Sequence, residues 1–481
     1  MTDMLDLPAH ELRRRIGAKA ISPVELLEAS IARIEAVNPA VNAIVATCFE
    51  RARSEAREAE RKITAGESLN ALHGLPVSIK DLNDTEGLRT TYGSRAYANH
   101  VPNADERSVA RLRAAGAIVI GKSNAPEFGA GINTTNGVYG PTRNPFDTAR
   151  ICGGSSGGAA VSLATGMNPI AHGSDTGGSL RIPAAYCGIV GFRPTPGLVP
   201  VEDRHCGWMP LSVQGPMARN AADAALMLSA MAAYDPEDPL SGPVDAASFA
   251  ALPEVDLSKL RVALSEDLGF VPVEPDMRSA FRSKLAEFSA IFHKAEWRDP
   301  PLADAKRIYE VQRTVNAVVA YRELVESKPD LVSANLRGNV ETGLRFTLED
   351  QAKAHAGQTR LYRAMVGFFR EVDLLITPTM AFPPHPIEET FRTVADAKPL
   401  ATYFDGVGLT YGLTVAAVPS ISIPCGLDPT GAPFGLQLAA APRADRFLLA
   451  AASALERSFA GRPNLVRPLA NIAALSQTRG S

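Results

Sequence analysis

The residues best suited to chemistry in this sequence are serines that follow paired glycines. Gly177 and Gly178 immediately precede Ser179, and consecutive glycines let neighbouring backbone N–H groups point into one concavity that binds an oxyanion. A serine in such a turn is well placed to attack a carbonyl carbon. Ser179 is therefore a candidate nucleophile, although a Gly-Gly-Ser fragment alone is more often an ordinary turn.

A lysine at the end of an apolar run strengthens this interpretation. Lys80 directly follows the run Leu75–Ile79. Burial among apolar side chains disfavours the charged ammonium form, lowers the pKa and makes lysine a general base near neutral pH. The alternative is a lysine at a strand end whose amino group reaches solvent. A serine that is activated by Lys80 needs no histidine.

A second glycine-rich pattern, Gly153–Gly157, fits the G-x-S-x-G nucleophile elbow of α/β-hydrolases, with Ser155 at its centre. Helix-forming residues Ala159–Ala164 follow it, as that motif requires. The hydrolase mechanism also needs an acid and a histidine later in the chain. His385, after Asp373, is the candidate, but the prolines around His385 favour an exposed loop.

A third pattern, Gly116–Ser123, matches the letters of a P-loop. A P-loop needs an irregular turn whose N–H groups face phosphate, whereas Ala117–Ile120 has the composition of a β-strand. A strand would direct these N–H groups into a sheet. A nucleotide-binding protein that uses this segment is the alternative to an enzyme that uses Ser179. We regard the match to the P-loop pattern as accidental.

Composition limits the classes of protein to which the chain can belong. Of its 481 residues 46% are hydrophobic and 21% charged, which is typical of a globular protein with a large core. The 49 basic and 52 acidic residues give a net charge of -3 without a basic stripe. A dedicated nucleic-acid binder is therefore not expected.

The sequence also bears on compartment and cofactors. Its N-terminus does not resemble a signal peptide, and no apolar run approaches the roughly 20 residues that span a bilayer. We therefore expect a cytoplasmic protein without a membrane partner. The cysteines are odd in number and form no C-x-x-C pair, so we expect free thiols, no disulfide framework and no zinc site. They are Cys48, Cys152, Cys187, Cys206 and Cys425.

The first 65 residues have the pattern of helices. Ser22 is a predicted N-cap, with Glu25 three residues later and apolar residues at helical spacing behind it. Asn38 and Pro39 are expected to end this helix.

From residue 72 onward, short apolar runs alternate with helical stretches. Leu75–Ile79 and Ala117–Ile120 are predicted strands, and Arg107–Ala115 is a predicted helix between them. Two later runs, Asp373–Thr377 and Pro419–Pro424, are predicted to return to the same sheet. This alternation predicts an α/β fold in which the sheet has parallel segments and helices on its faces.

No glycine-serine linker and no internal repeat divides the sequence, so we expect one domain over residues 1–481. Within it, 1–65 is the expected helical segment and 72–200 the catalytic core. Residues 220–372 are the expected peripheral helical layer, and 373–470 return to the core.

Three ordered blocks resemble the amidase signature family. They are Leu-Pro-Val-Ser-Ile-Lys-Asp at 75–81, Gly-Gly-Ser-Ser-Gly-Gly at 153–158 and Gly-Ser-Asp-Thr-Gly-Gly-Ser-Leu-Arg-Ile-Pro-Ala at 173–184. Their order and separation are highly specific, and the similarity covers nearly the whole chain. Further similar segments are 125–128, 136–147, 375–379, 419–424 and 435–437.

The resemblance implies a Ser-Ser-Lys triad. Ser179 would be the nucleophile, Ser155 the bridging serine after a cis peptide from Gly154, and Lys80 the base. The neighbouring Ser156 would be a supporting hydroxyl. The expected oxyanion-hole N–H groups are those of Thr176, Gly177, Gly178 and Ser179.

The implied fold is α/β, with a large mixed β-sheet covered by helices on both faces, and the implied reaction is hydrolysis of a carboxylic amide. Neutral Lys80 would take a proton from Ser155, which takes one from Ser179 as that oxygen attacks the carbonyl. The amine leaves, and water then releases the acid from the acyl-enzyme. The implied reaction needs no metal and no cofactor. Asp175 and Arg181 flank the turn with opposite charges, and we interpret them as its support.

The expected substrate is a small aryl or medium acyl amide. By the resemblance, the acyl pocket is lined partly by Phe128–Ile132, and the substrate-binding candidates in it are Gly129, Ala130 and Gly131. The candidate apolar walls are Trp208, Tyr321, Phe404 and Tyr411.

The alternative within the family is the glutamine-hydrolysing A subunit of a tRNA-dependent amidotransferase, which works beside a partner protein. Such proteins are expected to carry an acid for the glutamine amino group at the position of Val407, whereas the nearest acid here is Asp405. We therefore expect a small-molecule amide as the partner and no nucleic acid. A homodimer stays open.

Overall fold

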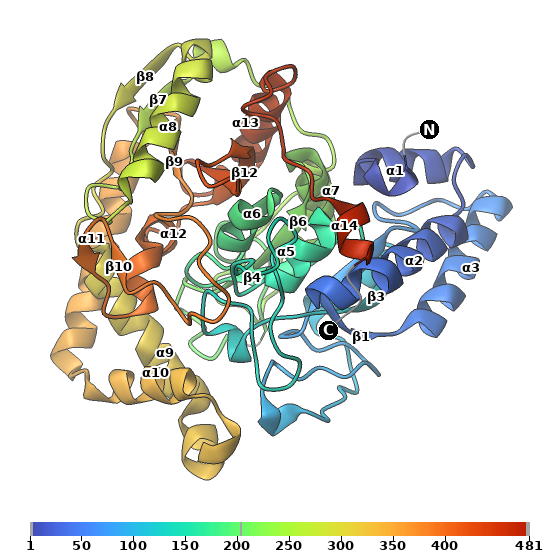
Figure 1. Cartoon of the computed structure of the whole chain (residues 1–481), viewed down its shortest axis with the longest axis horizontal. Coiled ribbons are helices and arrows are strands. Elements are labelled where there is room, and N and C mark those ends of the chain that lie inside the picture. Colours follow the sequence, from blue (N-terminus) through green and yellow to red (C-terminus); the bar gives the residue numbers. More distant parts are fainter. Residues whose placement is uncertain (1–2, 203, 478–481) are drawn as a thin grey trace.

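The computed structural model describes residues 3–202 and 204–477. One mixed sheet runs through the molecule (Figure 1). Among the described residues it has eleven strands, which come from both the N-terminal and the C-terminal parts of the sequence. Their order across the sheet is β1 (Ile44–Thr47), β3 (Ile118–Ser123), β2 (Pro76–Lys80), β4 (Ile170–Asp175), β6 (Val213–Ala218), β5 (Val190–Arg193), β12 (Ser420–Leu427), β13 (Pro433–Ala439), β9 (Leu374–Pro378), β7 (Arg261–Leu264) and β8 (Lys294–Trp297). A separate hairpin consists of β10 (Val394–Ala395) and β11 (Lys398–Pro399).

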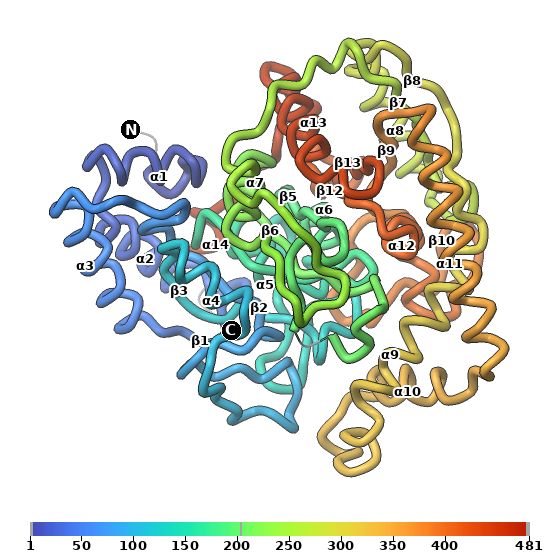
Figure 2. The backbone as a smooth tube through the Cα atoms, turned by 180° about the vertical axis from the view of Figure 1, so that it is seen from behind, coloured from blue at the N-terminus to red at the C-terminus, as the bar shows by residue number. Residues whose placement is uncertain are grey.

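Helices cover the sheet, as expected for an α/β fold. The N-terminal helices lie at one end of the molecule and α9, α10 and α11 at the other (Figures 1 and 2). The described α-helices are α1 (Ala9–Gly17), α2 (Pro23–Val41), α3 (Phe49–Ala65), α4 (Arg107–Ala114), α5 (Gly157–Ala164), α6 (Arg181–Cys187), α7 (Ala221–Met231), α8 (Pro275–Phe288), α9 (Ala305–Ser327), α10 (Ala334–Arg345), α11 (Leu348–Phe368), α12 (Gly408–Val415), α13 (Asp445–Ser458) and α14 (Ile472–Gln477).

Parallel pairs lie in two parts of the sheet. Strand β2 is parallel to both β3 and β4, and β7 is parallel to both β8 and β9. The strands between these groups pair antiparallel. Strands β2 and β3 are buried along their whole length, although β2 contains Ser78 and Lys80 and β3 ends in Lys122 and Ser123.

Two regions that were expected to be helical also contribute strands. The segment 1–65 contains β1, which pairs antiparallel with β3 at one edge of the sheet. The segment 220–372 contains β7 and β8, which form the opposite edge through the pairing of β7 with β9. These strands have only four residues each, too few for a periodic pattern to distinguish them from loops.

The capped helix near the N-terminus begins where the sequence predicts. The Ser22 hydroxyl accepts from the N–H groups of Val24 and Glu25, and the capping box is complete. The predicted end at Asn38 and Pro39 is wrong, because α2 continues to Val41. A proline so close to the C-terminus interrupts only the last turn.

The segment with P-loop letters is a strand. Residues Ile118–Ser123 form β3 between β1 and β2, so their backbone is paired within the sheet. Lys122 is buried, and its amino group donates to the carbonyl of Asn83 and to the Thr85 hydroxyl. This geometry is that of a central strand and leaves no phosphate-binding turn.

Helix α5, which follows Ser155 and Ser156, is closely packed. All eight of its residues are buried, and six of them are glycine, alanine or serine. A Cβ atom on Gly158 would lie 2.2 Å from the backbone nitrogen of Asn124. The helix therefore lies tightly against neighbouring backbone, which holds the preceding serines in place. Among the described residues no helix combines the length and the apolar character needed to cross a bilayer.

Candidate active site

Lys80 lies at the last position of β2 and is fully buried. Its Nζ atom is 2.7 Å from the Oγ of Ser155, 2.8 Å from the Oγ of Ser156 and 3.0 Å from the Oγ of Ser174. The two serines named by the sequence and a third that it did not single out thus surround one amine.

The environment of Lys80 favours the neutral amine. Burial lowers its pKa to about 7, and the negative charge of Asp175 opposes this change only in part. A neutral amine donates two hydrogen bonds and accepts one, whereas an ammonium group only donates. With three hydroxyls around a neutral Nζ, one of them can donate to it, which is the arrangement required of a general base.

Ser155 and Ser156 lie in the turn that precedes α5. The peptide bond between Gly154 and Ser155 is cis, as the family resemblance implies. The backbone N–H of Ser156 donates to the carbonyl of Ser179 at 3.2 Å, which joins this turn to the Gly177–Ser179 turn. The hydroxyls of Ser155 and Ser179 share no hydrogen bond in the described structure, and such contacts often tighten only when substrate binds.

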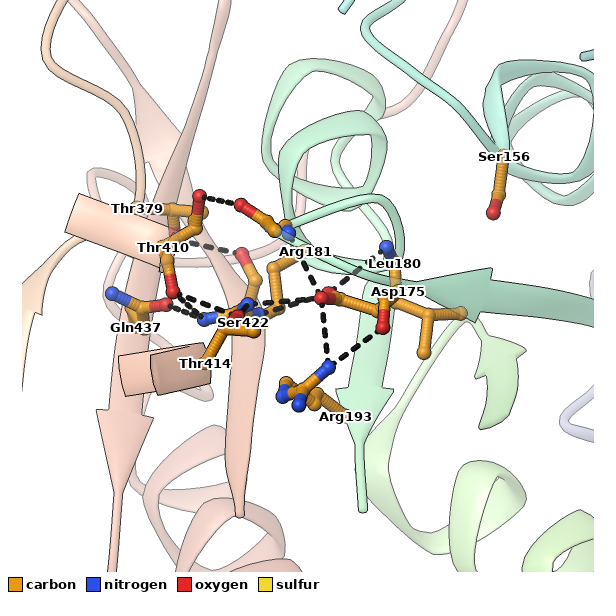
Figure 3. Close-up of polar contacts among 12 residues, drawn as sticks. Ser156, Asp175, Leu180, Arg181, Arg193, Thr379, Thr410, Thr414, Ser422 and Gln437 are labelled. Atoms are coloured by element: carbon orange, nitrogen blue, oxygen red, sulfur yellow. Dashed lines mark hydrogen bonds and ion pairs between the residues drawn. The ribbon is translucent and has the colours of Figure 1, made fainter. Parts of the chain in front are cut away.

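The turn that carries Ser179 connects β4 to α6 and is held by a buried carboxylate. The carboxylate of Asp175 accepts from the N–H groups of Gly178 at 2.8 Å and Leu180 at 3.2 Å. Arg181 contacts both carboxylate oxygens of Asp175, each at 3.1 Å (Figure 3). Asp175 and Arg181 thus have the supporting position that was expected of them.

Arg193 was not found from the sequence, although it also contacts Asp175. Its guanidinium group lies 3.2 Å from the carboxylate and also donates to the Asp175 carbonyl at 2.6 Å (Figure 3). Burial alone would raise the pKa of Asp175, but Arg181 and Arg193 hold it at about 2. The remaining partners of Arg181 come from distant segments: Thr410, Thr414 and Gln437.

The expected oxyanion-hole groups are only partly available. The N–H of Gly178 is directed at Asp175, so we correct the expectation for that residue. The N–H groups of Thr176, Gly177 and Ser179 have no acceptor among the residues that the structure describes. Gly177 also lies against Tyr309, because a Cβ on this glycine would be 2.1 Å from the tyrosine hydroxyl.

A cavity of about 450 Å³ opens beside Ser155 and Ser174. Ser155, Ser174 and Thr176 line it, and an aromatic group forms one wall. The Phe128 ring lies 4.6 Å from that of Tyr321 and 6.1 Å from that of Tyr92, which packs edge-on against Tyr97 at 5.1 Å. The aromatic wall is Tyr92, Tyr97, Phe128 and Tyr321.

The predicted substrate-binding residues divide between two cavities. Gly129 lines the cavity of Ser155, and a Cβ there would lie 3.2 Å from the Ser155 hydroxyl oxygen. Ala130 and Gly131 line a second cavity of about 640 Å³.

The four residues that were predicted to form apolar walls lie in different places. Tyr321 lies in the aromatic wall, whereas Phe404 lines the second cavity. Tyr411 is buried and stacks on Tyr309 with ring centroids 4.6 Å apart. Trp208 is 79% exposed, so its expected role as an apolar wall is wrong.

The alternative histidine has no place in this site. His385 lies in a loop, as expected, but it is buried rather than exposed, and its Nδ1 lies 3.0 Å from the Pro386 carbonyl. The structure shows no contact between His385 and Ser155. Among the described residues no group of three or more histidine, cysteine or acidic side chains could hold a metal ion.

Comparisons with known proteins agree with this geometry. The model of the Amidase family matches residues 25–449. The chain is 34% identical to an acylamidase of Rhodococcus erythropolis over 94% of this chain and 95% of that protein. It is 33% identical to the A subunit of the glutamyl-tRNA(Gln) amidotransferase of Geobacter sp. (strain M21) over 95% of this chain and 98% of that protein.

Solved structures show the same fold. A bacterial aryl acylamidase of the amidase signature family superposes with a TM-score of 0.87 at 28% identity, covering 99% of both chains. A 6-aminohexanoate cyclic dimer hydrolase superposes with a TM-score of 0.85 at 27% identity, covering 97% of this chain and 100% of that one. The chain therefore belongs to the amidase signature family and is an amidohydrolase.

Proposed function

We propose that the protein hydrolyses carboxylic amides through an acyl-enzyme on Ser179, with Ser155 as the bridging serine and Lys80 as the general base. The contact of 2.7 Å between Lys80 Nζ and Ser155 Oγ carries this proposal. The amine of Lys80 is buried, and its pKa is lowered to about 7. The contact joins this amine to a hydroxyl group in the neighbouring turn.

The proposed reaction begins with neutral Lys80. It takes the proton of Ser155 while Ser155 takes the proton of Ser179, and the Ser179 oxygen bonds to the carbonyl carbon. Free N–H groups of the Thr176–Ser179 turn bind the oxyanion, and one such donor lowers the barrier by about 3 kcal/mol. The proton returns to the leaving amine, and water then attacks the ester by the same route. Ser156 and Ser174 orient the amine of Lys80.

The aromatic wall supports a substrate that carries an aryl group. Flat rings at Tyr92, Phe128 and Tyr321 favour stacking or edge contacts with another ring. Two relatives have matching activities in their names, an acylamidase and an aryl acylamidase. We assign the aryl group, or a medium acyl chain in its place, to this wall.

The amidotransferase alternative finds less support in the site. Val407 is buried, and the nearby Asp405 forms an ion pair with Lys306. The Asp405 carboxylate also accepts from the N–H groups of Ala401 and Thr402. It is therefore already occupied and is not free to bind the amino group of glutamine.

The cysteines agree with a reducing compartment such as the cytoplasm. All five are free thiols in the structure. Burial raises the pKa of both Cys152 and Cys425 to about 12, so these thiols are unreactive.

The test uses the purified chain alone with EDTA, without tRNA, ATP or a partner. We expect acid and amine to be released from acetanilide and from medium-chain anilides, and no ammonia from glutamine. Turnover of glutamine alone, or activity that appears only with an amidotransferase partner protein, would assign the chain to the other branch of the family.

A further inference from the structure

Charged side chains line the cavity of Ser155 at several points, and most of them have partners. The carboxylate of Glu106 accepts from the side-chain amides of Asn83 and Gln214. Asp84 accepts from the Tyr92 hydroxyl at 2.5 Å. Arg204 forms an ion pair with buried Asp238. Each of these groups thus has a partner within the protein.

Arg313 differs from these groups. It lies on α9 and lines the same cavity, and it is only 7% exposed. Among the residues that the structure describes, no carboxylate lies within ion-pair distance of its guanidinium group. Its electrostatic partners are phenolic hydroxyls, those of Tyr403, Tyr309 and Tyr321.

A buried guanidinium group without a counter-ion is unfavourable. Removing a charge from water costs several kcal/mol, and neutral hydroxyls compensate this cost less than a carboxylate does. Arginine also presents a planar group of donors that matches a carboxylate in a two-pronged contact. A buried arginine that faces a cavity in this way is suited to a ligand that brings the missing negative charge.

The position of Arg313 is close to the catalytic turn. Tyr309 precedes it by one helical turn, and the Tyr309 hydroxyl is the nearest neighbour of the Cβ position on Gly177, at 2.1 Å. One tyrosine thus connects the surroundings of Arg313 to the turn of Ser179. Helix α9 also presents Asn316 and Tyr321 to the same cavity.

We propose that Arg313 binds a carboxylate group of the substrate, so that the enzyme prefers amides that carry a carboxylate a few bonds from the scissile carbonyl. The inference rests on the proposed amidase function and specifies its substrate class. The carboxylate belongs either to the acyl group or to the amine that leaves. In both cases it would form the same ion pair with the Arg313 guanidinium group.

The experiment compares substrates that have the same shape but differ in charge. For the acyl side, N-phenylsuccinamate is paired with N-phenyl-4-methylpentanamide. For the amine side, 4-acetamidobenzoate is paired with 4-isopropylacetanilide. The measured quantity is the ratio of kcat/KM for the anionic substrate to that for its neutral counterpart. We expect the native enzyme to prefer the anion about tenfold or more in one pair, and that pair identifies the side.

Arg313→Met is expected to lower that ratio about 30-fold or more, as the loss of one partner of a buried charge pair does. Arg313→Lys, which keeps the charge but not the planar group, is expected to give an intermediate ratio. The matched control is Val319→Ala, an uncharged change at an exposed position of α9 outside the cavity, which is expected to leave the ratio unchanged. A merely structural role for Arg313 would lower both rates together.

Binding provides a measurement that does not depend on turnover. In the Ser179→Ala background, calorimetry is expected to show tighter binding of the anionic compound than of its neutral counterpart, and Arg313→Met is expected to remove the difference. Equal ratios in the native and Arg313→Met enzymes, or equal binding of both compounds, would overturn the carboxylate site. Selective, Arg313-dependent binding without turnover of any amide would support the site and overturn the amidase function instead.

Discussion

The Nζ atom of Lys80 lies 2.7 Å from the hydroxyl oxygen of Ser155, and the lysine is fully buried. This contact is direct and needs no bridging water. In the described structure the amine contacts hydroxyl groups and forms no ion pair, and the charge of Asp175 only partly offsets the effect of burial on the Lys80 pKa. The properties of the enzyme should therefore depend on the protonation state of one side chain.

The first prediction concerns pH. The pKa of Lys80 is lowered to about 7, and only the neutral amine can act as the base. We expect kcat/KM to fall about tenfold for each pH unit below about 6 and to reach a plateau above about 8. The measurement is kcat/KM for a neutral anilide between pH 5 and 9. A rate that does not change below pH 6 would contradict a lysine base.

The second prediction separates charge from basicity at the same position. Lys80→Arg keeps a positive charge, but guanidinium does not deprotonate in proteins. We expect Lys80→Arg and Lys80→Met to lose activity equally, by about 10²–10⁴-fold, the typical contribution of a general base. Circular dichroism and thermal unfolding serve as controls for folding. Substantial activity in the arginine variant would contradict the assignment of the base.

The third prediction identifies the nucleophile. Ser179→Ala is expected to reduce kcat at least about 10⁴-fold and to prevent formation of the acyl-enzyme. Mass spectrometry after treatment with a fluorophosphonate is expected to locate the label on Ser179 in the native protein. Ser155→Ala is the matched control, and it should retain the labelling site but react more slowly. A label on Ser155 would favour the nucleophile-elbow interpretation.

The elements that carry the site could be predicted because the residues that determine each of them are neighbours in the sequence. The strand that ends at Lys80 is a short and mostly apolar segment, and helix α2 begins at a complete capping box. The family resemblance then implied that Lys80 and Ser155 meet, although the strand and the turn are 75 residues apart. No periodicity or spacing in the sequence could have shown that contact by itself.

Other features could not be predicted because they depend on tertiary packing. Arg193 reaches Asp175 from a different strand, and nothing near it in the sequence marks it. Arg313 lies in an ordinary helical pattern, and only the folded protein shows that no carboxylate among the described residues pairs with it. Trp208 shows the converse, since a large apolar side chain was expected in a wall and is exposed.

The fourth prediction concerns the buried carboxylate at the turn. Asp175→Asn leaves the Arg181 and Arg193 guanidinium groups buried without a negative charge. Breaking a buried ion pair in this way costs about 3–5 kcal/mol of unfolding free energy. Denaturant unfolding of both proteins measures the change, and activity should fall with it because the turn of Ser179 loses its support.

The matched control for Asp175 is an ion pair near the surface. Asp373 contacts Arg261 at 2.8 Å, but their side chains are 30% and 42% exposed. Asp373→Asn is therefore expected to cost about 1 kcal/mol or less. Equal effects of the two substitutions would mean that Asp175 does not hold the turn.

The fifth prediction tests how closely α9 approaches the Gly177–Ser179 turn. A Cβ atom on Gly177 would lie 2.1 Å from the Tyr309 hydroxyl oxygen and 2.8 Å from the ring carbon that bears it. Gly177→Ala must therefore displace either the turn or Tyr309. Because a displacement of about 1 Å at a reacting group costs about 100-fold in rate, we expect a loss of that order in kcat with an intact fold.

The neighbour that causes the clash at Gly177 can be removed. Combining Gly177→Ala with Tyr309→Leu takes away the hydroxyl and the ring edge, so we expect part of the lost kcat to return, relative to Tyr309→Leu alone. The double-mutant cycle measures this coupling directly, because residues in contact deviate from additivity. Gly367→Ala is the control for substituting a glycine, since nothing lies within 4 Å of its Cβ position. Strictly additive effects of the substitutions at positions 177 and 309 would show that Tyr309 does not limit the space at the turn, and would place α9 farther from Ser179.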